Sequence, residues 1–141
     1  MKKTNGVNWC GPWALAFLTD RTYEAADMLA RKKANRKNKI QNMTTRVMER
    51  CLGTKTFTRH SNMTVTRAMD NLLPGRIYLL WVTRHYLILD TGTGMIIHNQ
   101  EPTWKPISEC RYRRTQVRGS ICWTPRKAGA EKFRLKKGLD K

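Results

Sequence analysis

Three apolar, β-branched and aromatic runs between residues 76 and 98 constrain the fold more than any other feature of the chain. The runs are RIYLLWV (76–82), HYLILD (85–90) and GMIIH (94–98). The dipeptide Thr-Arg separates the first two runs, and the turn-forming TGTG separates the last two. Runs of this composition are typical of strands, and such short links join strands that lie antiparallel. We therefore predict an antiparallel meander, with further short strands at 110–114 and 119–123.

The chain before residue 76 has helical patterns instead. Apolar residues recur at helical spacing in the segments 10–18, 22–33, 44–53 and 64–75. Thr22 and Thr64 suit N-caps, while Gly53 and the pair Pro74-Gly75 suit helix ends. Helices followed by an antiparallel sheet predict an α+β fold, with N-terminal helices packed on a C-terminal sheet. We expect a single domain over residues 1–125 and a flexible basic tail over residues 126–141.

The chain is strongly basic, with 28 Lys and Arg residues against 10 Asp and Glu residues and a formal net charge of +18. Such a charge favours binding to polyanions, because neutralised phosphates release condensed counterions. One cluster holds six basic residues, namely Arg31, Lys32, Lys33, Arg36, Lys37 and Lys39. This cluster is either a surface for nucleic acid or an acidic protein, or a solvated helix end, and the sequence leaves both interpretations open.

The four cysteines, at positions 10, 51, 110 and 122, argue against a metal site. The shortest separation between them is twelve positions, whereas zinc sites use closely spaced pairs. The start of the chain does not match an export signal, and a chain of 141 residues does not need disulfides. We therefore expect reduced thiols, no metal and no cofactor in a cytoplasmic protein. No apolar run approaches the roughly 20 residues that span a bilayer, so we expect no membrane partner.

Cys10, in the stretch NWCGPW, is the best candidate for a catalytic side chain. It lies at the predicted start of the first helix, where unpaired N–H groups and the helix dipole lower the pKa of a thiol. A thiol nucleophile also needs a base, and His85 is the histidine that stands where a predicted strand begins. The alternative is that Cys10 is a small buried residue between two tryptophans.

Asn99 is the candidate for the third residue of such a site, because an imidazole base needs a side chain that orients its far nitrogen. In an antiparallel pair the start of one strand lies beside the end of the next, so residue 85 should lie nearer to 99 than to Asp90. His60 falls in a polar loop, and His98 should alternate to the face opposite Asn99. We expect both of these histidines to be structural or solvated.

Together, these motifs resemble the papain-like cysteine peptidase superfamily. The likeness covers residues 5–102 and rests on Asn-x-Cys-Gly-Pro entering a helix, on PGRIYLLWVTRHYLILD and on GMIIHN. It is greatest to compact papain-like chains of phage and bacterial genomes and to double-glycine bacteriocin-processing peptidases. The resemblance implies a papain-like fold, with Cys10 as nucleophile, His85 as general base and acid, and Asn99 as orienter.

The oxyanion donor is where the chain departs from the pattern of that superfamily. Papain-like enzymes usually carry a Gln roughly six residues before the nucleophile, and a lost oxyanion donor costs about 100-fold or more in rate. Thr4 occupies this position here. Asn5, one residue further along, and Asn8, closer to Cys10, are the candidates to replace the missing amide.

Two functions of different classes follow from the sequence. In the first, the protein is a small intracellular cysteine hydrolase that cleaves a peptide, isopeptide or amide bond in a protein or peptide substrate. In the second, it is a basic factor, such as a phage protein that acts on host nucleic acid or acidic proteins, with the papain-like frame retained as a scaffold. Loss of Cys10 should abolish the first function and leave the second intact.

Overall fold

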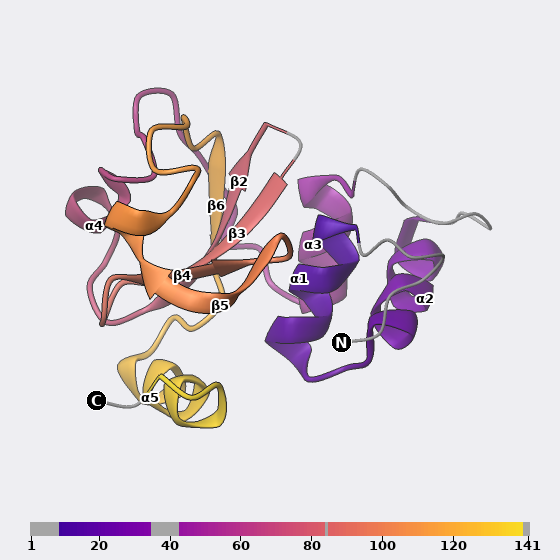
Figure 1. The fold of residues 1–141 in the computed structure, drawn as a ribbon. Helices are drawn as coiled ribbons and strands as arrows, with labels where there is room; N and C mark the ends of the chain where they lie inside the picture. Colours follow the sequence, from indigo (N-terminus) through magenta and orange to yellow (C-terminus); the bar gives the residue numbers. More distant parts are fainter. Residues whose placement is uncertain (1–8, 35–42, 84, 140–141) are drawn as a thin grey trace.

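The computed structural model describes residues 9–34, 43–83 and 85–139, and within these ranges it is an α+β structure (Figure 1). Its helices are α1 (Cys10–Thr19), α2 (Tyr23–Ala34), α3 (Thr45–Leu52), α4 (Ala68–Asn71), the 3-10 helix η1 (Ile107–Glu109) and α5 (Lys127–Lys136). Its strands are β1 (Thr58–Arg59), β2 (Ile77–Val82), β3 (His85–Asp90), β4 (Met95–His98), β5 (Glu101–Pro106) and β6 (Gly119–Cys122). The α+β class predicted from the sequence is confirmed. None of the helices in the described ranges has the length and apolar character needed to cross a membrane.

The strands form one antiparallel sheet in the order β1-β6-β2-β3-β4-β5. The predicted meander is its centre, where β2 pairs with β3 and β3 pairs with β4. In this register Trp81 lies opposite Tyr86, and Ile88 lies opposite Ile97. Every residue of β3 is buried. A strand that is covered on both faces needs apolar residues on both, which explains the nearly uninterrupted apolar sequence of β3.

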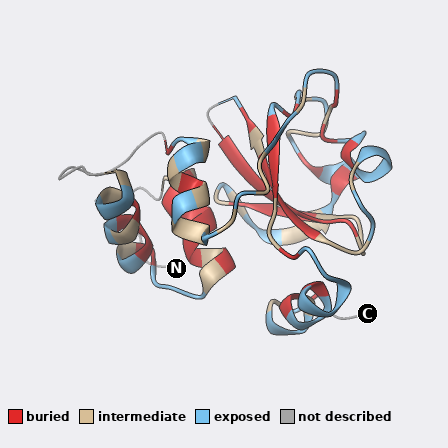
Figure 2. Ribbon diagram, turned by 180° about the vertical axis from the view of Figure 1, so that it is seen from behind, coloured by how far each residue is buried: buried red, intermediate tan, exposed pale blue. Residues whose placement is uncertain are grey.

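The two faces of the sheet are covered by different layers. Leu79, Ile88 and Ile97 pack in one core with buried residues of α1 and α2. Leu80 and Leu87, which alternate to the other face, pack in a second core with apolar residues of the segments before α4 and after η1. Figure 1 shows α1, α2 and α3 grouped beside the sheet, and Figure 2 shows that the central strands are buried along their length.

The first three helices begin and end where the sequence predicts. Helix α1 starts at Cys10 and accommodates Pro12 in its first turn, where a missing N–H costs nothing. The hydroxyl of Thr22 caps α2 by accepting the N–H of Ala25 at 3.1 Å. Helix α3 ends at Gly53, whose φ of 70° lies in the left-handed region that glycine adopts without strain.

Two predicted elements differ in the structure. The predicted helix over 64–75 is reduced to the four residues of α4. The residues before α4 form tighter turns, in which the N–H groups of Arg67 and Ala68 donate to the carbonyls three residues earlier, and Leu72 leaves the helix in an extended conformation with a ψ of 160°. The predicted strand at 110–114 is wrong, because this segment forms a series of turns.

The C-terminal segment is the largest departure from the sequence prediction. A flexible tail is predicted from residue 126, but α5 is docked against the rest of the protein. Phe133 of α5 is 7% exposed, and the Nε of Arg134 donates to the carboxylate of buried Asp90 at 2.8 Å. The indole of Trp104 donates to the carbonyl of Lys137 at 3.1 Å. Because a buried carboxylate is costly unless it is paired, Asp90 favours the docked position of α5.

We predict that Phe133→Ala lowers the free energy of unfolding by about 3 kcal/mol, because it removes a buried aromatic side chain and leaves a cavity. The matched control is Leu135→Ala on the same helix, whose side chain is 67% exposed and whose loss should have little effect. Chemical denaturation of the full chain measures both values. Equal, small effects for the two variants would show that α5 is not docked in solution.

Candidate functional site

Cys10 is held at the start of α1 by contacts on both of its sides. Before it, the backbone N–H of Trp9 donates to the hydroxyl of Tyr23 at 2.8 Å, which fixes the entry of the chain into the helix. After it, Gly11 lies against Met43, where an added Cβ would stand 2.5 Å from the Met43 Cβ. The glycine that follows the cysteine is therefore required by packing. These contacts give Cys10 one defined position.

The sulfur of Cys10 faces the beginning of β3. The backbone N–H groups of Tyr86, Gly11 and Cys10 itself lower the pKa of the thiol, but burial has the largest effect and raises the pKa above its ordinary value of 9.0. The thiol is therefore mostly protonated at neutral pH. Nucleophilic attack by Cys10 would need a base that takes up its proton.

His85 is the first residue of β3 and directly precedes the N–H group that faces the Cys10 sulfur. Its imidazole lies in a cluster of three rings. The ring centroid of His85 is 5.7 Å from that of His98 and 4.7 Å from that of Tyr112, and the rings of His98 and Tyr112 are 5.1 Å apart. We call His85, His98 and Tyr112 the ring cluster. It restricts the orientation of the His85 imidazole by packing.

His98 connects the ring cluster to a pair of charged side chains. Its Nε2 lies 3.2 Å from the carboxylate of Glu101, whose other oxygen lies 3.3 Å from the ammonium of Lys105. Burial lowers the pKa of His98 below its ordinary value of 6.5, His85 and Arg111 act in the same direction, and Glu101 opposes them. His98 is therefore neutral at pH 7 and contributes packing to the cluster, with no charge beside His85.

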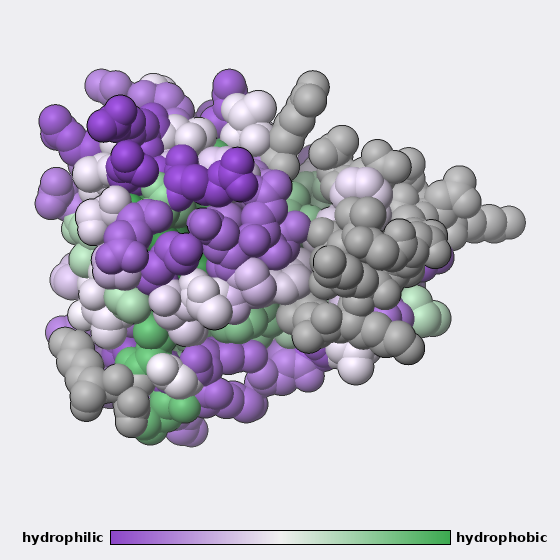
Figure 3. All heavy atoms as spheres, in the orientation of Figure 1, coloured by the Kyte–Doolittle hydropathy of each residue, from purple (hydrophilic) through white to green (hydrophobic). Residues whose placement is uncertain are grey.

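Tyr112 comes from the segment between β5 and β6 and is fixed by its own hydrogen bonds. Its hydroxyl donates to the side-chain oxygen of Gln100 at 2.7 Å, and Arg111 donates to the same oxygen at 3.2 Å. Burial raises the pKa of the Tyr112 hydroxyl, Arg111 lowers it, and Cys10 adds a smaller increase. Figure 3 shows that hydrophilic side chains gather on the face of the molecule that is turned toward the viewer in Figure 1.

Asn99, the predicted orienter, directly follows β4 and is partly exposed. The printed pairs of β3 and β4 end with Ile88 opposite Ile97, and Asn99 lies two residues beyond Ile97, in the turn between the end of β4 and β5. Asn99 thus belongs to the same end of the sheet as Cys10 and His85. Asp90, the alternative candidate to orient the His85 imidazole, lies at the other end of β3 and is bound by Arg134.

The remaining predicted residues lie in three places. Asn5 and Asn8, the predicted oxyanion donors, lie outside the described residues, as do Arg36, Lys37 and Lys39. Arg31, Lys32 and Lys33 form the last turn of α2, where Arg31 is paired with Asp27.

His60 is structural, with its Nε2 at 2.8 Å from the hydroxyl of Ser120. Among the described residues, no group of three or more His, Cys, Asp or Glu side chains is arranged to hold a metal ion.

Sequence reasoning missed His98 and Tyr112 as neighbours of His85. The hairpin between β3 and β4 could have indicated His98. Side chains alternate between the faces of a sheet, and the pairing of β3 with β4 puts positions 85 and 87 on the same face as positions 96 and 98. Tyr112 had no such signal, since it reaches the cluster through a series of turns.

Comparisons of the chain with protein-family models, curated proteins and solved structures find no match.

The lowered pKa of His98 predicts a loss of stability in mild acid. The pKa of such a histidine is lower in the folded than in the unfolded state. Its contribution to the free energy of unfolding is complete at a pH above the unfolded-state pKa and is lost as the pH falls below that pKa. His98→Gln should therefore lose less unfolding free energy than the wild type between about pH 7.5 and 5.5.

Chemical denaturation across this pH range measures the effect. His60→Gln is the comparison variant. Burial also lowers the pKa of His60, so this variant loses the contribution of His60 to the acid sensitivity and keeps the contribution of His98. A His98→Gln variant with the full acid sensitivity of the wild type would contradict the assignment of a neutral, buried His98.

Proposed function

We propose that this protein is a small papain-like cysteine hydrolase that cleaves a peptide, isopeptide or amide bond. Cys10 is the nucleophile, His85 is the general base and acid, and Asn99 orients the imidazole. The observation that supports the proposal most is the position of the Cys10 sulfur, which stands at the N-terminus of α1 and faces the N–H of the residue that follows His85.

The raised pKa of Cys10 determines how the first step would proceed. Because the thiol is protonated at rest, His85 takes its proton as the sulfur attacks the carbonyl carbon. The protonated His85 then gives this proton to the leaving amine when the carbon–nitrogen bond breaks, and a thioester on Cys10 remains. Water, deprotonated by His85, attacks the thioester, and the thiol leaves as the acid product forms.

The neighbours of His85 support this assignment through packing. The rings of His98 and Tyr112 lie beside the imidazole, with centroids 5.7 and 4.7 Å from its own, and their packing limits the orientations open to it. A base that is already oriented before the substrate binds lowers the entropic cost of the reaction. In this proposal Asn5 and Asn8 donate to the oxyanion, and a protein or peptide is the substrate.

The state of the cysteines fits a cytoplasmic site of action. All four cysteines are free thiols. Free thiols persist in the reducing cytosol and tend to be oxidised in secreted proteins. We therefore include a cytoplasmic location in the proposal.

Alkylation by iodoacetamide at neutral pH tests the roles of Cys10 and His85. We expect Cys10 to react faster than Cys51, whose pKa burial raises to about 11. His85→Ala should slow the alkylation of Cys10 by about tenfold or more, because a positioned base is typically worth a factor of about 100 or more. Peptide mass spectrometry resolves the four cysteines within one sample.

His60→Ala is the matched control, because it removes an imidazole that contacts Ser120 outside the candidate site. It should leave the rate at Cys10 unchanged. The hydrolase assignment fails if His85→Ala reacts at the wild-type rate, or if Cys10 reacts no faster than Cys51.

A further inference from the structure

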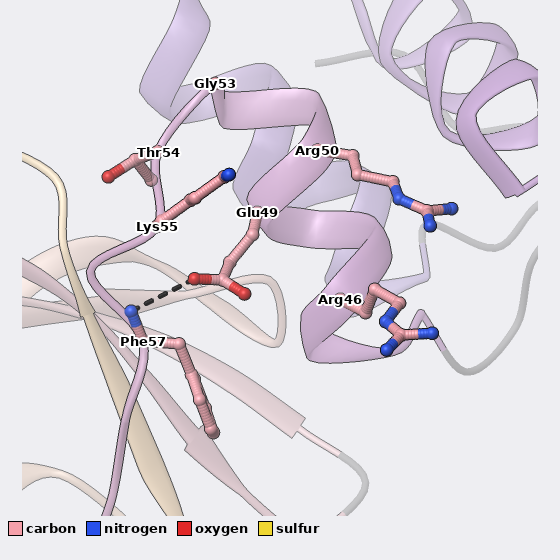
Figure 4. Close-up of a pocket in the computed structure, with 7 residues that line it drawn as sticks. All are labelled: Arg46, Glu49, Arg50, Gly53, Thr54, Lys55 and Phe57. Carbon is pink, nitrogen blue, oxygen red and sulfur yellow. Dashed lines mark hydrogen bonds between the residues drawn. The ribbon is translucent and has the colours of Figure 1, made fainter.

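A basic pocket lies along α3 and the segment that follows it, and its lining includes neither Cys10 nor the ring cluster. It has a volume of about 860 Å³ and lies between α3 and the segment that leads to β1. We call it the α3 pocket. The lining side chains that matter here are Arg46, Glu49, Arg50, Thr54, Lys55 and Phe57 (Figure 4).

The α3 pocket has an excess of positive charge that the fold does not use. Arg46, Arg50 and Lys55 are exposed cations. Arg46 and Lys55 make no hydrogen bond or ion pair with any other described residue. The one carboxylate of the lining, that of Glu49, accepts the backbone N–H of Phe57 at 3.1 Å, as Figure 4 shows. Glu49 therefore serves the fold, and Arg46 and Lys55 remain available to an anionic ligand.

The positive surface continues from the α3 pocket to the end of α2. The guanidinium of Arg50 donates to the backbone carbonyl of Lys33 at 3.4 Å, which joins the two helices at this point. Lys32 and Lys33 lie in the last turn of α2. A ligand that carries repeated negative charges, such as a phosphate backbone, can contact the pocket and this helix end together.

The shape and the uncharged groups of the pocket favour a single strand over a duplex. The phosphates of a duplex lie on a convex cylinder that meets only the rim of a concave pocket, whereas a single strand can bend into it. Phe57, whose ring lies beside Trp81, contributes the part of its apolar surface that is not buried, and Thr54 contributes a hydroxyl that also donates to Thr56 at 3.2 Å. At Gly53 an added Cβ would meet no atom within 4 Å, so the backbone is open to close approach by a ligand.

We propose that the α3 pocket binds single-stranded nucleic acid, with Arg46, Arg50 and Lys55 on successive phosphates and Lys32 and Lys33 along the continuing strand. This binding site is separate from Cys10 and does not depend on the hydrolase assignment. The net charge of +18 adds a long-range attraction that brings the strand to the surface.

The test is the fluorescence anisotropy of a labelled oligothymidine of about 20 nucleotides, titrated with the full chain between about 50 and 200 mM salt. The pocket variant combines Arg46→Gln, Arg50→Gln and Lys55→Gln. The matched control combines Arg67→Gln, Arg114→Gln and Lys132→Gln, which are exposed positions on other elements and remove the same charge. Cys10→Ala should bind like the wild type.

We expect the pocket variant to bind at least about tenfold more weakly than the control. It should also reduce the slope of log affinity against log salt by about 2, since each phosphate contact on a single strand contributes about 0.7. The pair Arg46→Gln and Lys55→Gln keeps the bond between Arg50 and Lys33, so it measures the effect without loosening α2 from α3. This pair should reduce the slope by about 1.4.

Three results would overturn the proposal. The first is equal weakening by the pocket and control variants, which would show a diffuse effect of charge. The second is a duplex of the same length, or polyglutamate, that binds as tightly as the single strand and depends on the same residues. The third is an absence of binding by the wild type at the lowest salt concentration.

Discussion

Tyr86 joins the start of the central strand to the start of α1, and the geometry of the candidate site depends on this connection. Its backbone N–H faces the sulfur of Cys10, and its ring is buried in the core between the helices and the sheet. Its hydroxyl donates to the carbonyl of Met43 at 2.8 Å, and Met43 packs against Gly11. One side chain thus fixes both the segment that carries the cysteine and the segment that carries His85.

The chain has a net charge of +18, and the way its carboxylates are paired determines which cations stay exposed without an acidic partner. Several of its few carboxylates are bound within the structure. Asp90 pairs with Arg134, Asp20 with Lys136 and Lys137, Asp27 with Arg31, and Glu101 with Lys105. Carboxylates that are used in this way cannot neutralise exposed arginines elsewhere. The α3 pocket is one result, because its only carboxylate is also held by a backbone N–H.

The parts of the fold that follow from local patterns could be predicted from the sequence. The strands β2, β3 and β4 were predictable because two short links leave little choice of pairing, and α1 could be placed because Gly-Pro follows Cys10. The docking of α5 could not be predicted, since it depends on the long-range pair between Arg134 and Asp90 and on only a few buried apolar residues. Tyr112 was missed for the same reason, because only the tertiary fold brings it to His85.

The claim on which the proposed function depends is that Cys10 and His85 interact directly. The most direct measurement is the NMR titration of the His85 ring carbons from mildly acidic to alkaline pH, in the wild type and in Cys10→Ala. Two groups in contact titrate as a coupled pair. We predict a second, alkaline inflection at His85 that follows the ionisation of Cys10 and disappears in Cys10→Ala. Identical titration curves in the two proteins would contradict the interaction.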